Sequence, residues 1–415
     1  RRSAWKISKR SNKPLTMAIS VLSGSPQAAT PVYNKMLFKV SGSLTSGANY
    51  RYVCDVKNSA GTTLVRLKSD KLPTTNYGFF DVSKVVETLI TPTAPSLTQA
   101  GFVDHAGFYA GYRLDFMEEY GATPVVQTGT VTTVSGNVAF AGNLEQLELA
   151  TWSGGVYFPS GAIVPSATRM LTTPTSRTVY PNGYGWLSIG QFNYGVGNAY
   201  IQYWSATGAT FARQFEVSAS DVSGNNMIRF GVGPMNMKAL TDAQCSDAQP
   251  GSYLFQQNKG DFYRVYFSKG GNTTESFYQQ YTFGPCQRFN SIPVHFINKY
   301  GGIDTYTFTL KNRKRANIKR ETYGYNSDVY GTTTYDKVWA GEFEYIYQLN
   351  SDWLTDAESE WLIELIRSSQ VWLELDGQLV EAVVNTNTYQ FVTRRNDKLQ
   401  LLQVEISEAY KNNIL

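Results

Sequence analysis

The sequence feature that most constrains the fold is a strand–turn–strand pattern in residues 294–310. The side chains of residues 294–297 alternate with a period of two, and those of residues 305–310 do so again. Successive side chains of a β-strand point to opposite faces, so this period indicates two strands. The turn Asn298-Lys-Tyr-Gly-Gly302 lies between them, and its glycines can adopt the positive φ that a tight turn needs. We therefore predict a β-hairpin, and we expect it to join a central sandwich to a C-terminal unit.

The same period recurs along most of the chain in short segments that turn residues separate. About seven such segments, Tyr157-Phe158 among them, lie between residues 131 and 284, a spacing typical of a β-sandwich or jelly-roll. The sequence predicts a mainly β protein with β-sandwich or jelly-roll-like domains and a C-terminal α+β unit. The expected division is a basic N-terminal arm and linker (1–32), an N-terminal β domain with one short helix (33–130), a central β-sandwich (131–284) and a C-terminal α+β domain (285–415).

Two helices are expected among these strands. Asp81 has the character of a helix N-cap, and apolar residues follow it at helical spacing as far as Ile90. Thr355 and Glu358 have the spacing of a capping box, in which each side chain satisfies a backbone N–H group of the first turn. In the helix that follows, the apolar side consists of Ala357, Trp361, Leu362, Leu365 and Ile366, whereas Glu360, Glu364 and Arg367 are expected elsewhere.

Composition favours a protein that makes extensive protein contacts. Aromatic residues make up 14% of the chain, and charged residues only 17%. Six of the 37 basic residues lie in the first thirteen positions, and without them 31 basic residues face 33 acidic ones, a net charge of −2. A protein that reads nucleic acid should carry basic character on its folded surface. We therefore expect nucleic acid to be a less favoured partner.

The cysteines and the apolar runs exclude several classes of protein. Cys54, Cys245 and Cys286 lie far apart, without the spacing of a zinc site or a disulfide framework, so we expect buried thiols and no metal or cofactor. No run of eighteen apolar residues occurs, which predicts no transmembrane helix. The first sixteen residues lack the apolar core of a signal peptide, so we expect no export by the general pathway; Met17 could be an internal start.

The sequence contains no convincing catalytic residues. Asp104 would point away from the neighbouring His105 on a strand and could not orient it as a triad requires. His295 lies in an alternating strand, where a packed or cross-strand histidine is the more common case. Glycosidase chemistry needs two carboxylates that converge across a sugar, and the candidate pairs are Glu118 with Glu119 and Glu342 with Glu344. Adjacent residues on a strand face apart, and the second pair should share a solvated face. We expect no enzyme.

Two basic clusters are the candidate partner-binding residues. Either could bind phosphate, but with a nearly neutral body we favour docking on acidic surfaces of neighbouring subunits. The N-terminal arm contributes Arg1, Arg2, Trp5, Lys6, Lys9, Arg10 and Lys13. The second cluster is a run typical of a solvated loop or strand edge, which we predict as a contact loop. It contributes Lys311, Arg313, Lys314, Arg315, Lys319 and Arg320.

Several segments resemble the layout of a known class of proteins. They are Asn49-Tyr-Arg-Tyr-Val-Cys-Asp-Val, Tyr77-Gly-Phe-Phe-Asp-Val-Ser-Lys-Val-Val-Glu, Arg113-Leu-Asp-Phe-Met-Glu-Glu-Tyr-Gly, Val294-His-Phe-Ile-Asn-Lys-Tyr-Gly-Gly-Ile-Asp-Thr-Tyr-Thr-Phe and Trp353-Leu-Thr-Asp-Ala-Glu-Ser-Glu-Trp-Leu. Together they look like a layout in virion structural proteins of phages that infect Bacteroidetes, the crAss-like phages among them. The resemblance runs from about Met36 to the C-terminus and implies a building block without a catalytic site. The basic arm departs from that layout.

The leading hypothesis is a non-enzymatic virion structural protein, made in the host cytoplasm, in a tail, neck or capsid-associated position. It would assemble with copies of itself and with neighbouring virion proteins. One alternative is a receptor- or carbohydrate-binding virion module, which predicts a groove lined by aromatic residues for a glycan receptor. Another is a capsid protein whose basic arm contacts the genome, and a hydrolase is the weakest alternative.

Overall fold

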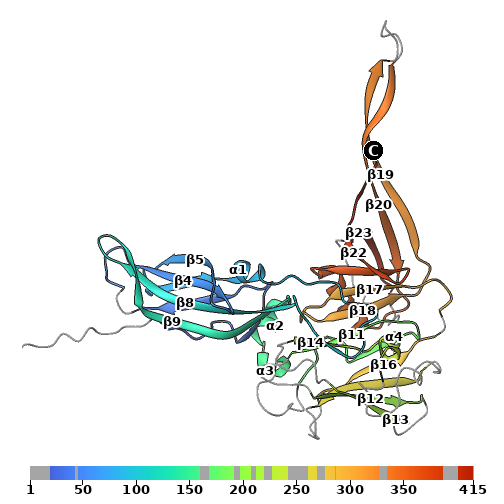
Figure 1. Ribbon diagram of the computed structural model, residues 1–415, viewed down its shortest axis with the longest axis horizontal. Helices are drawn as coiled ribbons and strands as arrows, with labels where there is room; N and C mark the ends of the chain where they lie inside the picture. Colours follow the sequence, from blue (N-terminus) through green and yellow to red (C-terminus); the bar gives the residue numbers. More distant parts are fainter. Residues whose placement is uncertain are drawn as a thin grey trace, which may run out of the picture. The chain divides into compact units, whose positions relative to one another are not determined.

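The computed structural model describes residues 19–42, 45–158, 168–190, 197–206, 212–218, 227–241, 260–268, 276–285, 287–326, 334–386 and 401–414 (Figure 1). Its contacts divide the chain into two compact units. The first is drawn from Arg1–Ala28, Lys35–Thr88 and Gly111–Asn137, and the second from Ala29–Asn34, Leu89–Ala110 and Val138–Leu415. The segments expected as a central and a C-terminal domain thus lie in one unit, and the four-part division of the chain stays a prediction.

The first unit consists of two small antiparallel sheets around one core. Phe116 bridges them, with ring centroids 6.0 Å from Phe38 and 5.8 Å from Phe80. The turn at residues 58–61 closes with a 3.0 Å hydrogen bond from the Gly61 N–H to the Asn58 carbonyl. One sheet contains β1 (Ser20–Val21), β3 (Leu37–Ser41) and β6 (Tyr77–Asp81). The other contains β4 (Arg51–Asn58), β5 (Thr63–Asp70), β8 (Tyr109–Tyr120) and the first part of β9 (Val125–Phe140).

The helix expected after Asp81 is shorter than predicted and begins later. Helix α1 spans Ser83–Glu87, and its N-cap position is Val82. Asp81 ends strand β6, where its carboxylate accepts hydrogen bonds from the Ser83 N–H at 3.1 Å and from the Met36 N–H at 3.3 Å. The carboxylate therefore still satisfies the helix start, but it does so from the strand. Cys54 is fully buried, as expected, whereas Cys245 and Cys286 lie outside the described residues.

The second unit begins with the β-sandwich that the sequence predicts. Leu187, Ile201, Phe230 and Val265, from both sheets, share one buried core. One sheet has the order β10 (Ser176–Val179), β16 (Gln279–Phe283), β15 (Phe262–Ser268), β12 (Asn198–Trp204), β13 (Arg213–Ser218). The other has the order β11 (Trp186–Gly190), β14 (Met227–Gly231), β7 (Phe102–Asp104), and α4 (Pro234–Lys238) follows β14.

The prediction of a strand at Tyr157-Phe158 is wrong, because Tyr157 is the last residue of a short helix. Tyr157 stacks on Trp152 and on Tyr300, with ring centroids 4.9 and 4.8 Å apart, and this packing outweighs the strand preference of aromatic residues. The helices here are α2 (Gln146–Ala150) and α3 (Gly154–Tyr157), and β2 (Ala29–Pro31) pairs in parallel with the end of β9.

The C-terminal sheet and its helix form the predicted α+β part. Helix α6 (Asp356–Arg367) has the expected capping box at Thr355, and Trp361 packs 5.8 Å from Phe296 in the core below it. The strand order is β18 (Ile303–Phe308), β17 (Ile292–Ile297), β21 (Val371–Leu375), β22 (Gln378–Val384), β23 (Gln403–Glu408), β20 (Thr334–Asn350), β19 (Arg313–Asn326), and β24 (Asn412–Ile414) also pairs with β20.

The hairpin that most constrained the sequence reading is confirmed. Strands β17 and β18 pair antiparallel from Ile292 with Phe308 to Ile297 with Ile303. The Asn298 N–H donates to the Gly302 carbonyl at 2.9 Å, and Gly301 has the positive φ, 77°, that the turn requires.

Candidate functional site

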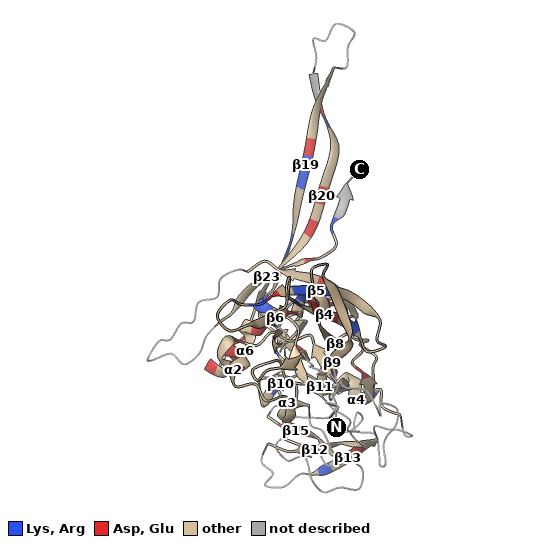
Figure 2. Ribbon diagram, turned by 90° about the vertical axis from the view of Figure 1, so that its left-hand side faces the viewer, with Lys and Arg blue, Asp and Glu red and all other residues tan. Residues whose placement is uncertain are grey.

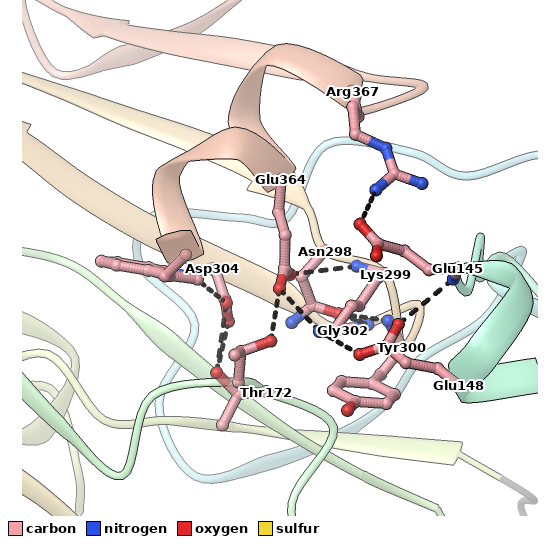
Figure 3. Close-up of polar contacts among 12 residues, drawn as sticks. Glu145, Glu148, Thr172, Asn298, Lys299, Tyr300, Gly302, Asp304, Glu364 and Arg367 are labelled. Carbon is pink, nitrogen blue, oxygen red and sulfur yellow. Dashed lines mark hydrogen bonds and ion pairs between the residues drawn. The ribbon is translucent and has the colours of Figure 1, made fainter. Parts of the chain in front are cut away.

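A buried polar cluster surrounds the 298–302 turn, where helices α2 and α6 and the segment 168–173 meet it (Figure 3). The Lys299 ammonium lies 2.6 Å from a Glu148 oxygen and 3.6 Å from a Glu364 oxygen. The Lys299 N–H also donates to Glu364 at 3.2 Å, and the Thr173 hydroxyl donates to the other oxygen of that carboxylate. Lys299 thus joins helix α2, through Glu148, and helix α6, through Glu364, to the turn.

The Glu364 carboxyl group of this cluster has an unusually high pKa. Burial, reinforced by the Asp304 charge, raises the pKa of Glu364 from 4.5 to about 7. Burial alone would lower the pKa of Lys299, but its hydrogen bond to Glu148 and the surrounding carboxylates raise it. Lys299 therefore stays charged at neutral pH while Glu364 is close to half-protonated.

Asp304 is the second anchor of the cluster. It is fully buried, forms an ion pair with the buried Arg177, and accepts hydrogen bonds from the Thr172 hydroxyl at 3.0 Å and the Trp361 indole N–H at 2.8 Å. The carboxylate thus ties β18 to α6 and to the strand that carries Arg177. The partners of Asp304 are fixed protein groups. Arg177 borders a small recess, but Glu364 and Lys299 line neither that recess nor the larger cleft beside it, so the main part of the cluster stabilises the fold.

The sequence did not identify this cluster. The helical pattern predicts that Glu364 lies away from the apolar side of its helix, yet only 7% of the residue is exposed. Glu364 can be buried because the Thr173 hydroxyl and the Lys299 N–H donate hydrogen bonds to its carboxylate. The one available signal was a glutamate within two residues of Leu362 and Leu365.

The two histidines are both fully buried. His105 packs against Phe108, its ring nitrogens have no hydrogen-bond partner among the described residues, and burial, together with the Arg229 charge, holds its pKa well below 6.5. Asp104 instead accepts a 3.0 Å hydrogen bond from the Tyr109 hydroxyl.

His295 has the partners that the sequence did not reveal. Its Nδ1 lies 2.8 Å from the Thr305 hydroxyl across the strand pair, and its Nε2 lies 3.3 Å from a Glu374 oxygen. The series Thr305–His295–Glu374 resembles a nucleophile–base–acid triad, but the recess that Thr305 borders has a volume of about 30 Å³. Such a volume is sufficient for about one water, so a substrate does not fit in the recess beside the Thr305 hydroxyl.

The carboxylate pairs are arranged as strand geometry predicts. Glu118 accepts a 2.7 Å hydrogen bond from Tyr50, whereas Glu119 pairs with Lys68 at 2.7 Å. Glu342 and Glu344 share one face of β20, where Glu342 lies opposite Lys319 and Glu344 opposite Asn317 in the register with β19.

The basic cluster expected as a contact loop is mostly a strand. Lys311 precedes β19, and Arg313, Lys314, Arg315, Lys319 and Arg320 lie within it. The loop prediction is wrong because these residues pair in register with β20 from Arg313 opposite Gln348 to Arg320 opposite Gly341. They are exposed, on the edge strand of the sheet. The predicted arm residues Arg1, Arg2, Trp5, Lys6, Lys9, Arg10 and Lys13 lie outside the described residues.

Two of the positive charges of β19 have an acidic or an aromatic neighbour. Arg315 forms a 2.8 Å ion pair with Glu405, and the Lys314 ammonium lies 3.7 Å from the centre of the Tyr345 ring. Both basic and acidic residues are visible along β19 and β20 in Figure 2. A phosphate at Lys319 would meet the Glu342 carboxylate on the same face, so the register favours a protein partner over a polyanion.

Strands β19 and β20 together form the candidate partner-binding site, which we call the ribbon (Arg313–Asn326 with Thr334–Asn350). Strand β23 pairs with β20 only from Ile346 to Asn350, and β24 only from Gly341 to Phe343. From Glu321 outward the two strands therefore have only each other among the described strands, and Figures 1 and 2 show them extending beyond the rest of their sheet.

The ribbon exposes large apolar side chains. Exposed fractions are 60% for Trp339, 50% for Val338, 48% for Tyr323 and 47% for Ile318. Trp339 lies at a shift of register, between Ala340, which pairs with Glu321, and Val338, which pairs with Thr322. Closer to the core, Ile318 pairs with Phe343 on the face of the ribbon that also carries Arg320, while Lys319 and Glu342 occupy the other face.

Comparison with known proteins leaves the family open. No family model matches the sequence, and no curated protein matches it. Among solved structures, the native conformation of Escherichia coli alpha-2-macroglobulin is similar over 96% of this chain and 20% of that chain, at 9% identity and a TM-score of 0.18. At that score the likeness carries no argument about fold or function.

The described residues include no membrane-spanning helix and no cluster of metal-ligating side chains. In the part of the chain that the structure describes, no helix has the length and apolar character needed to cross a membrane. Over the same residues, no group of three or more histidine, cysteine or acidic side chains could hold a metal ion.

Proposed function

We propose that this chain is a non-enzymatic structural subunit that assembles with further copies of itself through the ribbon. The observation that carries the proposal is the outer part of β19 and β20, a two-stranded element with Trp339, Val338 and Tyr323 exposed. A two-stranded hairpin without further cover is marginally stable in water. Burial of these side chains against another subunit would supply the missing stabilisation.

The edge position of β19 supports the same proposal. An edge strand presents backbone N–H and C=O groups that another chain can pair with, and natural proteins usually shorten, charge or cover such edges. Strand β19 is 14 residues long and carries charge at its inner half, whereas its outer half carries Tyr323 and Tyr325. Aromatic residues are enriched in the centres of protein interfaces.

We further propose that the assembly is part of a phage virion, in a tail, neck or capsid-associated position. The support is the resemblance of the hairpin, cap and core segments to virion structural proteins of phages that infect Bacteroidetes. Mass spectrometry of purified particles would test this placement, because a subunit absent from them could not be a virion component.

The assembly proposal is tested by the mass of the full chain in solution. Multi-angle light scattering should give a multiple of the 46.3 kDa chain, and Trp339→Ser should shift the distribution toward the single chain. Trp353→Ser is the matched control, since Trp353 is 58% exposed but lies outside the ribbon. A parent chain that stays monomeric at high concentration, or equal effects of the two variants, would overturn the proposal.

A further inference from the structure

A cleft of about 350 Å³ opens in the second unit, away from the ribbon. The turn after β10, the end of β16, the segment before β17 and strand β18 enclose it. Its volume lies in the range of small-molecule sites, which is roughly 300–1,000 Å³. Its walls include Tyr180, Asn182, Phe283, Gln287, Ser291 and Thr307.

One wall of the cleft is held by a tight turn. The Gly183 N–H donates to the Tyr180 carbonyl at 2.8 Å, and the Gly284 N–H donates to the Val179 carbonyl at 2.9 Å. A Cβ at Gly284 would lie 2.7 Å from a ring carbon of Tyr180. The glycine therefore allows the tyrosine ring to lie against the backbone, and the wall is formed before any ligand arrives.

The chemistry of the lining is neutral. The described residues that line the cleft include none with a charged side chain; they combine aromatic and proline surfaces with amide and hydroxyl groups. Amides and hydroxyls can both donate and accept hydrogen bonds. A charged ligand would find no counter-charge in these walls, whereas a ligand with hydroxyl groups on an apolar frame would match both kinds of surface.

A smaller recess continues from the cleft and adds a second observation. The two share Tyr180, Gly183 and Thr307 in their linings. Tyr281 and Arg177, both buried, border the recess, and the Tyr281 hydroxyl and the Arg177 Nε have no hydrogen-bond partner among the described residues. Buried polar groups without partners are costly and uncommon, so these two groups point to a ligand that hydrogen-bonds at the inner end of the cleft.

We propose that this cleft binds a neutral saccharide unit, with a sugar ring against the Tyr180 side and a hydroxyl group directed toward the recess. A peptide is the competing occupant, because β18, which carries Thr307, is the edge strand of its sheet, and a proline-rich peptide is therefore one arm of the test. The inference does not rest on the proposed assembly, because the cleft and the ribbon share no residue.

The test is a glycan array that carries neutral, sialylated and sulfated glycans, followed by saturation-transfer NMR with the free sugars that bind. We expect neutral glycans to bind the full chain. Tyr180→Ala should weaken binding at least about tenfold, as expected for loss of a well-packed aromatic contact. Asn182→Ala, at an exposed position where the fold should tolerate it, should also weaken binding, and Tyr410→Ala is the control, since Tyr410 is 71% exposed outside the cleft.

Three results would overturn the proposal. One is an array without binding at high protein concentration, and another is binding only to charged glycans or to a proline-rich peptide included as a probe. The third is glycan binding that neither Tyr180→Ala nor Asn182→Ala changes. Light scattering on the same variants separates this outcome from failure of the assembly proposal, because neither substitution touches the ribbon.

Discussion

The buried carboxyl of Glu364 makes a quantitative prediction about stability and pH. We consider Glu364→Gln, which keeps the shape of the side chain and removes its ionisation. In the folded chain burial raises the pKa of Glu364 to about 7, against 4.5 for the ordinary group. The folded state therefore binds this proton more tightly than the unfolded state, and stability is lost as pH rises from about 4.5 through 7.

The size of the effect follows from the same two pKa values. At about 1.4 kcal/mol per pKa unit, the rise from 4.5 to about 7 corresponds to about 3 kcal/mol, most of it between pH 5 and pH 8. The glutamine variant lacks this loss. We expect the free energy of unfolding of the variant, relative to the parent, to improve by about 2 to 3 kcal/mol from pH 5 to pH 8.

The assay is urea unfolding at a series of pH values, with the pKa of Glu364 measured directly by carbon NMR of labelled glutamate. His105 acts in the opposite direction in the parent, because its lowered pKa makes the folded state lose stability as pH falls below 6.5. The difference between variant and parent removes that contribution. Glu360→Gln, at an exposed site on the same helix, is the control and should leave the pH dependence unchanged.

Parallel stability curves for Glu364→Gln and its parent would refute the reasoning. They would mean that Glu364 ionises with its ordinary pKa and that Lys299 fully compensates its burial. An NMR titration midpoint near 4.5 would lead to the same conclusion.

Two further predictions concern the ribbon and the helix above the C-terminal sheet. Changing Arg313, Lys314 and Arg315 together to Glu should weaken assembly more at low salt than at high salt, because salt screens exposed charges. The circular dichroism of the subunit should stay the same, and light scattering that does not depend on salt would contradict the prediction. Thr355→Ala should lower the free energy of unfolding by about 1 kcal/mol in urea, because the Glu358 N–H loses its 3.3 Å acceptor, and an unchanged midpoint would show that the cap adds no stability.

The elements that the sequence predicted well depend on residues close together in the chain. The Asn298–Gly302 turn and the Thr355–Glu358 cap each need only a few neighbouring residues. The helix start near Asp81 is displaced by one residue because the same carboxylate also accepts a hydrogen bond from the Met36 N–H.

The candidate sites were predicted less well, since they depend on distant partners. The basic run in β19 concealed a strand, because consecutive exposed cations leave no apolar alternation to detect. His295 acquired Glu374 from a strand 79 positions away, and Glu364 acquired Thr173 from 191 positions away. The cleft around Tyr180 likewise needs four separate segments.

The sequence by itself determined that this chain is mainly β, where its clearest hairpin turns and where its longest described helix begins, because side-chain period and capping are local properties. Only the tertiary structure decided which strands are neighbours, that Glu364 is buried, and that β19 and β20 continue past their sheet with Trp339 exposed. These features depend on pairing and burial between distant residues, and no local pattern encodes which distant groups will satisfy a buried charge or leave an aromatic side chain uncovered.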